Sequence, residues 1–322
     1  MPISNPKQAI PVYLKGIAMG AADIVPGVSG GTIAFISGIY EELIDSIGAI
    51  GPKTLRILFK EGIAAAWRSF NGTFLLTLML GILTSVFTLS TLISELLHSH
   101  PEKLWSFFFG LIVISAIHIG RQIRQWRASE VIAITLGTVM AYGITAIAPA
   151  QLPMTPLTVF VAGAIAICAM ILPGISGSFI LLILGKYHDI TGIIKNAAHF
   201  EVNARDIGNL VVFGFGCLLG LLSFSKFLKW LLARHQSVTL ATLTGFMLGS
   251  LCRIWPFQVD TTPEVTEFKD KVFRSLSLSE IPVDSQFLLI VVIAIASAAA
   301  VILLDRATSP HNSDEKPLVE EQ

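Results

Sequence analysis

The stretch Pro26-Gly27-Val28-Ser29-Gly30-Gly31-Thr32 interrupts an apolar segment that covers residues 12–47. A second stretch, Pro173-Gly174-Ile175-Ser176-Gly177-Ser178, interrupts another apolar segment at residues 157–194. Proline lacks a backbone donor and clashes with the preceding helical turn, and glycine reaches backbone conformations that no helix uses. Each segment is therefore predicted to consist of helical pieces on either side of an irregular break.

The two interrupted segments are copies of each other. Placing Pro26 on Pro173 also places Gly16 on Gly163, Ala22 on Ala169, Ser29 on Ser176 and Tyr40 on Tyr187. The likeness continues more weakly to Gly110 and Gly245. The sequence therefore predicts two related units, residues 1–150 and residues 151–308, followed by a disordered polar tail at 309–322.

The composition places both units in a membrane. Hydrophobic residues make up 53% of the 322 residues and charged residues 14%, whereas soluble domains carry about 25% charged residues. The net charge of zero argues against a nucleic-acid partner. The three cysteines lie in apolar runs without metal-ligand spacing, so we expect neither a disulfide nor a metal site. We also expect no catalytic residue and no cofactor. The short polar N-terminus is not expected to be a cleavable signal peptide.

Six further apolar stretches are candidates for transmembrane helices, which need roughly 20 apolar residues. The fold class is accordingly predicted to be an all-α integral membrane protein. In each unit, one interrupted segment precedes three spans. The predicted spans lie at about 72–97, 104–120, 131–148, 208–228, 238–255 and 286–304.

The topology depends on whether the interrupted segments cross the membrane. If they are re-entrant hairpins, each unit crosses three times and the units are inverted; if they cross fully, the units are parallel. The hairpin arrangement puts the basic residues inside, as the positive-inside rule requires, and leaves 98–103, 149–156, 186–207 and 256–285 outside. We therefore predict an inverted repeat of two re-entrant hairpins and six spans, with both termini in the cytoplasm. The basic residues placed inside are Lys7, Lys15, Lys53, Arg56, Lys60, Arg68, Arg121, Arg124, Arg127, Lys226, Lys229 and Arg234.

Residues 52–70 have a basic face formed by Lys53, Arg56 and Lys60 at helical spacing. The apolar residues Leu55, Leu58, Phe59 and Trp67 lie mainly elsewhere on the helix. This pattern predicts an amphipathic helix on the cytoplasmic membrane surface. An ordinary basic loop helix without lipid preference explains the pattern equally well.

The two breaks are candidate anion-binding loops. Irregular backbone inside a membrane is tolerated where it is buried in protein or lines a watery cavity, and paired broken helices mark the binding site in many transporters. A helix that starts after each break would point free amides at an anion. Kinks that merely allow tight helix contacts are the alternative. The predicted site residues are Pro26, Gly27, Val28, Ser29, Gly30, Gly31, Thr32, Pro173, Gly174, Ile175, Ser176, Gly177 and Ser178.

Three ionisable residues are candidates for coupling or gating. Asp23 stands deep in the first interrupted segment, where it could carry a proton, bind a cation or cap the helix start near Gly27. Its counterpart in the second copy is Met170, so any such role is asymmetric. His118 and Arg253 occupy matching positions at the ends of matching spans. Each is a candidate for contact with the substrate, or else a residue of a helix interface.

The motif Gly20-Ala21-Ala22-Asp23-Ile24-Val25-Pro26-Gly27-Val28-Ser29-Gly30-Gly31-Thr32, with its second copy, resembles a bacterial family linked to undecaprenyl-phosphate translocation. The resemblance covers residues 12–305. It implies a multi-pass protein of the bacterial cytoplasmic membrane that returns a polyprenyl phosphate lipid from the outer to the inner leaflet, so that the lipid carrier of cell-wall synthesis is recycled. It also implies that Asp23–Thr32 and Pro173–Ser178 form the headgroup site. Coupling to H+ or Na+ and assembly into a homo-oligomer stay open.

Two other functions compete with this interpretation. The motif also resembles the Pro-Gly-x-Ser-Arg-Ser stretch of membrane undecaprenyl-diphosphate phosphatases, but Gly30 and Gly177 stand where those enzymes have arginine. Phosphoryl transfer needs positioned charges, so we expect a transporter and no enzyme. A transporter of a small soluble anion would use the same helix starts. A purely structural scaffold has no need for paired breaks.

Overall fold

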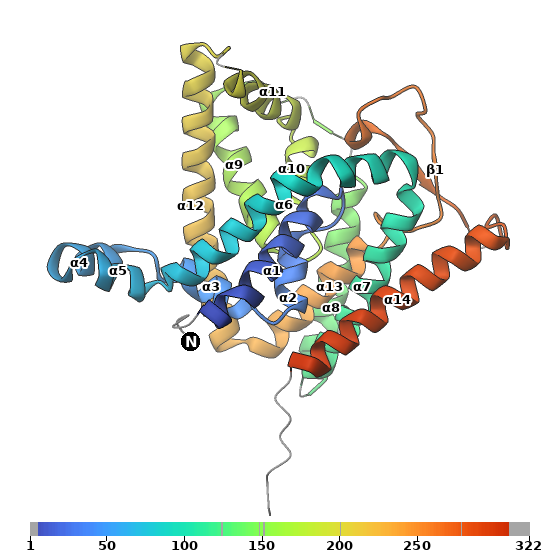
Figure 1. Cartoon of the computed structure of the whole chain (residues 1–322), viewed down its shortest axis with the longest axis horizontal. Helices are drawn as coiled ribbons and strands as arrows, with labels where there is room; N and C mark the ends of the chain where they lie inside the picture. The colour runs from blue at the N-terminus through green and yellow to red at the C-terminus, as the bar shows by residue number, and fades with distance from the viewer. Residues whose placement is uncertain are drawn as a thin grey trace, which may run out of the picture.

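The computed structural model describes residues 6–123, 125–147, 149–150, 152–199, 201–277 and 279–308, which are mostly helical (Figure 1). Residues 1–5, Arg124 and the predicted polar tail at 309–322 lie outside the described residues. The first unit contains α1 (Pro6–Ile24), α2 (Gly30–Ile36), α3 (Tyr40–Ala49), α4 (Pro52–Glu61), α5 (Ile63–Ser69), α6 (Gly72–Ser99), α7 (Pro101–Gln122) and α8 (Ala128–Thr145). The second unit contains α9 (Pro156–Ile171), α10 (Gly177–Ile183), α11 (Tyr187–Ala198), α12 (Ala204–Arg234), α13 (Gln236–Ser250) and α14 (Ser285–Thr308).

Five of the six predicted spans coincide with helices that are long and apolar enough to cross a membrane. These are Gly72–Ser99, Pro101–Gln122, Ala128–Thr145, Ala204–Arg234 and Ser285–Leu303. The predicted span at 238–255 is not borne out at full length, because α13 has 15 residues and turns follow it at 251–254. Most of α13 is buried by neighbouring helices, so its apolar sequence is explained by the protein core as well as by lipid.

The two interrupted segments have the same local structure. The break between α1 and α2 and the break between α9 and α10 each contain a glycine with positive φ, +88° at Gly27 and +83° at Gly174. These glycines occupy equivalent positions in the two copies, and side chains rarely adopt this conformation. The helices after the breaks, α2 and α10, are seven residues long. The axes of α10 and α11 differ by 115°, a bend compatible with either a broken span or a re-entrant loop.

Helix packing also repeats between the units. In the first, α1 packs against α6, and a Cβ added at Gly16 would clash with the carbonyl of Leu78. In the second, α9 packs against α12, and a Cβ at Gly163, the counterpart of Gly16, would lie 2.6 Å from the carbonyl oxygen of Phe213. Small residues let helix backbones approach closely in membranes. The remaining long helices interlock the units, since α7 packs against α14 and α13 against α8.

A small antiparallel sheet lies outside the helical body. Its strands, β1 (Gln258–Asp260) and β2 (Phe273–Ser275), pair with Val259 opposite Arg274. The turn η1 (Phe268–Asp270) lies between them, and Phe268 packs its ring against those of His98, Trp105 and Phe273. The sequence pattern predicts no strand here, because the strands are only three residues long. It fixes the loop between α13 and α14 over one end of the helices (Figure 1).

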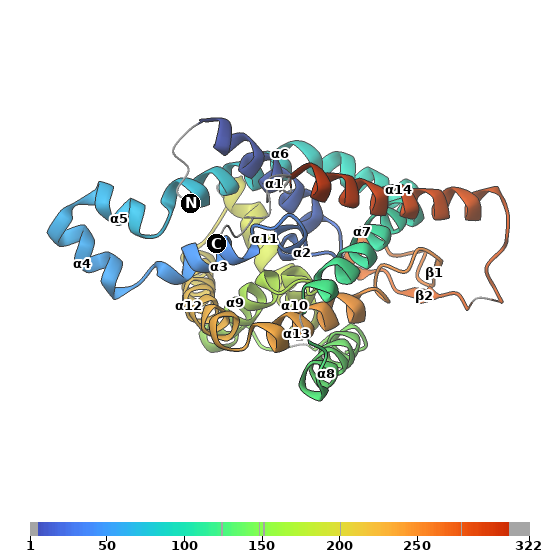
Figure 2. The same cartoon turned by 90° about the horizontal axis from the view of Figure 1, so that it is seen from below.

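The amphipathic segment predicted at 52–70 is helical, but Gly62 divides it into α4 and α5. The two short helices project sideways from the body in both views (Figures 1 and 2).

Candidate functional site at the two breaks

The two breaks lie against each other in the protein interior. The Ser29 hydroxyl donates a hydrogen bond of 3.0 Å to the carbonyl oxygen of Met170. From the second break, the Gly174 amide donates a hydrogen bond of 2.9 Å to the Thr32 hydroxyl oxygen. A Cβ added at Gly31 would lie 2.5 Å from the carbonyl oxygen of Ile171. The structure thus brings the two predicted loops into direct contact, and Ser29 and Thr32 are fully buried between them.

The amides at the start of α2 are occupied. The Gly30 amide donates to Asp23 Oδ1 at 2.6 Å, and the Gly31 amide donates to the Ser29 hydroxyl at 3.1 Å. The Thr32 amide donates to the Ser29 carbonyl oxygen at 2.9 Å. Asp23 therefore caps the helix after the break, at Gly30 and not at Gly27. An anion could bind the Gly30 amide only if the hydrogen bond between this amide and the Asp23 carboxylate broke.

The start of α10 is different. Met170 stands where the first copy has Asp23, so no carboxylate caps this helix. The Ser176 hydroxyl lies 3.0 Å from the Ser178 hydroxyl. Within the described part of the chain, no acceptor is found for the amides of Gly177 and Ser178. The second break therefore has more free donors than the first.

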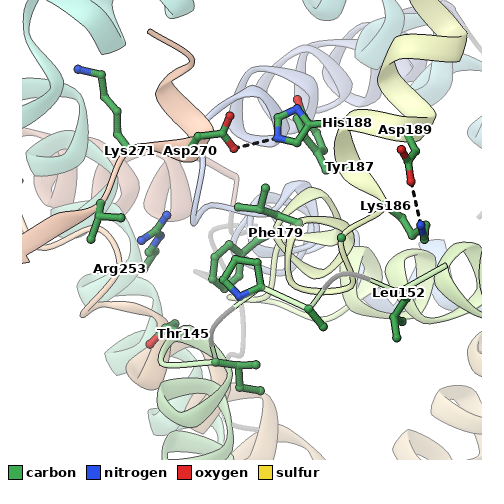
Figure 3. A pocket seen from close by; sticks show the side chains of 16 residues that line it. Thr145, Leu152, Phe179, Lys186, Tyr187, His188, Asp189, Arg253, Asp270 and Lys271 are labelled. Atoms are coloured by element: carbon green, nitrogen blue, oxygen red, sulfur yellow. Dashed lines mark hydrogen bonds and ion pairs between the residues drawn. The ribbon is translucent and has the colours of Figure 1, made fainter. Parts of the chain in front are cut away.

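A cavity of about 640 Å³ leads toward the breaks (Figure 3). Its walls come from the end of α8, from α10 and α11, and from the loop that contains Asp270 and Lys271. Three wall residues, Thr145, Phe179 and Arg253, also line a narrow void next to it. That void is bounded by Gly27, Gly174 and Ser176 of the two breaks. A group that enters the large cavity would therefore reach the break residues past Arg253.

Most of the basic groups around the cavity are neutralised by nearby carboxylates. Lys186, whose side chain is 2% exposed, pairs with Asp189 at 2.8 Å. Figure 3 shows this pair and the pair of His188 with Asp270, which are 2.8 Å apart. Lys271 donates a hydrogen bond of 2.6 Å to Asp260 and thereby holds the pKa of that carboxyl below its ordinary value. Asp260 therefore stays ionised, and Lys271 paired, at neutral pH.

Arg253 is the exception. Among the residues that the structure describes, no carboxylate pairs with its guanidinium, whose Cζ lies 5.0 Å from the centroid of the Phe179 ring. The stem of Arg253 packs on the first break, since a Cβ at Gly27 would lie 2.7 Å from its Cγ. One unpaired cation thus touches the first break and the first turn of α10. His118, its counterpart in the sequence, is exposed on α7 and is not among the residues of the large cavity.

Asp23 faces a different cavity, of about 400 Å³, lined also by Pro26, Ser94, His98 and Glu267. Tyr187 is common to this cavity and the larger one. The carboxylate at the first break and the guanidinium at the second are therefore reached by separate routes.

No sequence motif marks the paired ions around the larger cavity. Lys186, Asp270 and Lys271 come from a short turn and a loop that carry no motif. One signal was available for Lys186: the copies match at Gly38 and Gly185 and at Tyr40 and Tyr187, yet Ile39 stands opposite Lys186. A charged residue inside one copy of an otherwise apolar repeat indicates a local function.

A family model described as undecaprenyl phosphate translocase-like matches residues 19–271. A polyprenyl-phosphate transporter of Vibrio cholerae is 48% identical over 301 residues, which cover 91% of this chain and 95% of the relative. A polyprenyl-phosphate transporter of Staphylococcus aureus is 36% identical over 256 residues, covering 76% of this chain and 85% of the relative. No solved structure matches the chain.

Proposed function

Because this chain belongs to the undecaprenyl phosphate translocase-like family, we propose that it moves polyprenyl phosphate across the bacterial cytoplasmic membrane. The direction is from the outer to the inner leaflet, which returns the lipid carrier for reuse in cell-wall synthesis. The relatives are named as transporters, and this chain acts as one without cleaving its substrate. Both termini face the cytoplasm.

The observation that carries the proposal is the position of Arg253. Its guanidinium has no carboxylate partner in the described part of the chain and lies at the junction of the cavity with both breaks. Guanidinium binds phosphate through two parallel hydrogen bonds and stays charged at every physiological pH. A phosphate beside Arg253 would also be near the free amides of Gly177 and Ser178. The headgroup is therefore held between Arg253 and the start of α10, with the hydroxyls of Ser176 and Ser178 as further donors.

The cavity suits a ligand with one charged end and a long apolar tail. Ile147 and Leu152 line it where α8 ends and are themselves exposed. A prenyl chain leaving past these residues stays in lipid while the headgroup enters the protein. By the positive-inside rule, this cavity opens to the outer side, because the loops at 149–156, 186–207 and 256–285 surround it.

Release to the inner leaflet requires a second conformation. Within each unit an equivalent pair packs together, α1 with α6 and α9 with α12, so each pair can move with its break, while the contacts of α7 with α14 and of α8 with α13 between the units act as the hinge. Rocking of one unit against the other would close the outer cavity and open the site inward. Asp23 couples this motion to a cation or proton. Its carboxylate holds the Gly30 amide, and its neutralisation would weaken this contact and so let the first break move.

Reconstitution tests the proposal directly. Purified full-length protein in liposomes that contain undecaprenyl phosphate should speed the appearance of its headgroup in the opposite leaflet, compared with protein-free liposomes. Uptake of inorganic phosphate, measured in parallel, should stay at the protein-free rate. Phosphate uptake without lipid movement would favour a transporter of small anions, and release of phosphate from undecaprenyl diphosphate would favour a phosphatase.

A further inference from the structure

The projecting helices α4 and α5, with Gly62 between them, form a hairpin that the proposed transport does not use. None of the residues of α4 is buried, and in α5 only Ala66 is. Large apolar side chains are fully presented on this hairpin: Phe59 is 85% exposed and Ile63 77% exposed. Leu55 is also exposed. Apolar groups gathered on such a thin projection indicate contact with something outside the chain.

The charges of the hairpin are on the side opposite its apolar groups. At 100° per residue, Lys53, Arg56 and Lys60 fall on one face of α4, and Leu55, Leu58 and Phe59 fall on the other. Arg68 adds a further cation in the last turn of α5. A basic face and an apolar face of this kind allow a helix to lie in the boundary between lipid headgroups and acyl chains.

Contacts at both ends fix the hairpin to the body. At its start, the Thr54 hydroxyl donates a hydrogen bond of 2.8 Å to the carbonyl oxygen of Ala49 in α3, the helix whose Asp45 pairs with Lys229 of α12 at 2.9 Å. At its end, Asn71 donates a hydrogen bond of 2.8 Å to Glu42, also of α3. Trp67 of α5 donates one of 3.0 Å to Thr73 in the first turn of the span α6. The hairpin is therefore held at the level where α6 begins.

That level carries the marks of a membrane boundary. On α12, Phe227 and Trp230 lie on either side of Lys229 in the sequence, stack at 6.2 Å and are both about half exposed. Aromatic residues gather at the boundary between lipid and water. Further along α6, Leu76, Met79 and Leu83 are exposed apolar residues on a span, as expected of side chains in contact with lipid. The hairpin thus leaves the body where the apolar surface of the spans begins.

We infer that the α4–α5 hairpin is a docking surface for the anionic surface of the bilayer, in the leaflet at the start of α6. Phe59, Ile63 and Leu55 insert between the headgroups. Lys53, Arg56 and Lys60 attract anionic phospholipids, which a polybasic face concentrates near a membrane protein. This inference does not depend on which substance the protein transports.

Photo-crosslinking in vesicles tests the inference with the full chain. Phe59 is replaced by benzoylphenylalanine, and the protein is reconstituted in phosphatidylcholine with a minority of phosphatidylglycerol. The same replacement at Leu83 on α6 is the positive control, because this exposed position of a span contacts lipid whether or not the hairpin does. Replacement at Glu201, in the loop before α12, is the water-exposed control. After illumination, mass spectrometry identifies lipid adducts at each position.

Lipid adducts are expected at 59 and 83 but not at 201, with phosphatidylglycerol enriched at 59 by about twofold or more over the bulk ratio. The triple variant Lys53→Glu, Arg56→Glu and Lys60→Glu should bring this ratio back to the bulk value without changing the adducts at 83. The inference is overturned if position 59 gives no lipid adduct while position 83 does. It is equally overturned if phosphatidylglycerol is not enriched at 59, or if the charge reversal leaves the enrichment unchanged.

Discussion

The Gly174 amide donates a hydrogen bond of 2.9 Å to the hydroxyl oxygen of Thr32, although 142 residues separate them in the chain. Thr32 is fully buried, so no water can replace its hydroxyl. Thr32→Val should destabilise the protein by about 1–3 kcal/mol, because it leaves the Gly174 amide without an acceptor. Thr32→Ser keeps the hydroxyl and is the matched control. Thermal unfolding in detergent checks the difference, and equal stability of the two variants would contradict it.

The backbone contact at Gly31 gives a second prediction about the same junction. A Cβ there would lie 2.5 Å from the carbonyl oxygen of Ile171 and 2.9 Å from that of Met170. Gly31→Ala should therefore push the breaks apart and cost about 1–3 kcal/mol of stability. Gly192→Ala is the control, since nothing lies within 4 Å of a Cβ at that helical position. If the two alanine variants have the same melting temperature and transport rate, close contact at Gly31 is not required.

The doubled motif was sufficient to predict the helix breaks and their resemblance to each other. Proline and glycine act locally, so Pro26 and Pro173 indicate breaks whatever surrounds them. Five spans followed from apolar length alone. The shorter length of α13 could not be predicted from apolar length, because a buried helix and a lipid-facing helix have similar composition. Inverted topology stays a prediction, because apolar length and helix contacts do not define the direction in which a helix crosses the membrane.

The site was also predictable only in part, because local sequence indicates the loops but not the contacts that they make in the folded protein. The sequence indicated which residues form the two loops, but not that Asp23 fills the Gly30 amide and leaves α10 uncapped. That asymmetry depends on the rotamer of Asp23, which brings its carboxylate to the Gly30 amide. Of the three ion pairs, only His188 with Asp270 joins α11 to the loop after α13. Lys186 pairs with Asp189 three residues on, and Lys271 pairs with Asp260 within the loop, at positions that carry no motif. Only the mismatch of Ile39 with Lys186 in the repeat marked the position.

Asp23→Asn tests whether this carboxylate couples transport to a cation. Asparagine keeps the size and can still accept a hydrogen bond from Gly30, but it neither titrates nor carries charge. We expect transport by the unaltered protein to vary across a pH or sodium series, and transport by the variant to vary much less. Glu267→Gln and His98→Gln, which alter the other ionisable side chains of that cavity, should keep the dependence, as should Tyr187→Phe. If the Asp23 variant responds to pH and sodium like the unaltered protein, Asp23 has no coupling role.

Arg253 gives the sharpest prediction, because its proposed role separates charge from geometry. Arg253→Gln removes the only cation at the junction of the breaks that lacks a carboxylate partner in the described residues, and should lower transport by about 10- to 100-fold at low substrate concentration. Arg253→Lys keeps the charge but cannot bind phosphate through two parallel hydrogen bonds or stack on Phe179 in the same way. Its transport rate should therefore lie between those of the unaltered protein and the Arg253→Gln variant. Lys271→Gln is the matched control, since it removes from the same cavity a cation that is already paired with Asp260.

Transport measured over a range of lipid concentrations separates binding from turnover, because loss of headgroup binding raises the half-saturating concentration. An Arg253→Gln protein that transports like the Lys271→Gln protein would place the headgroup elsewhere.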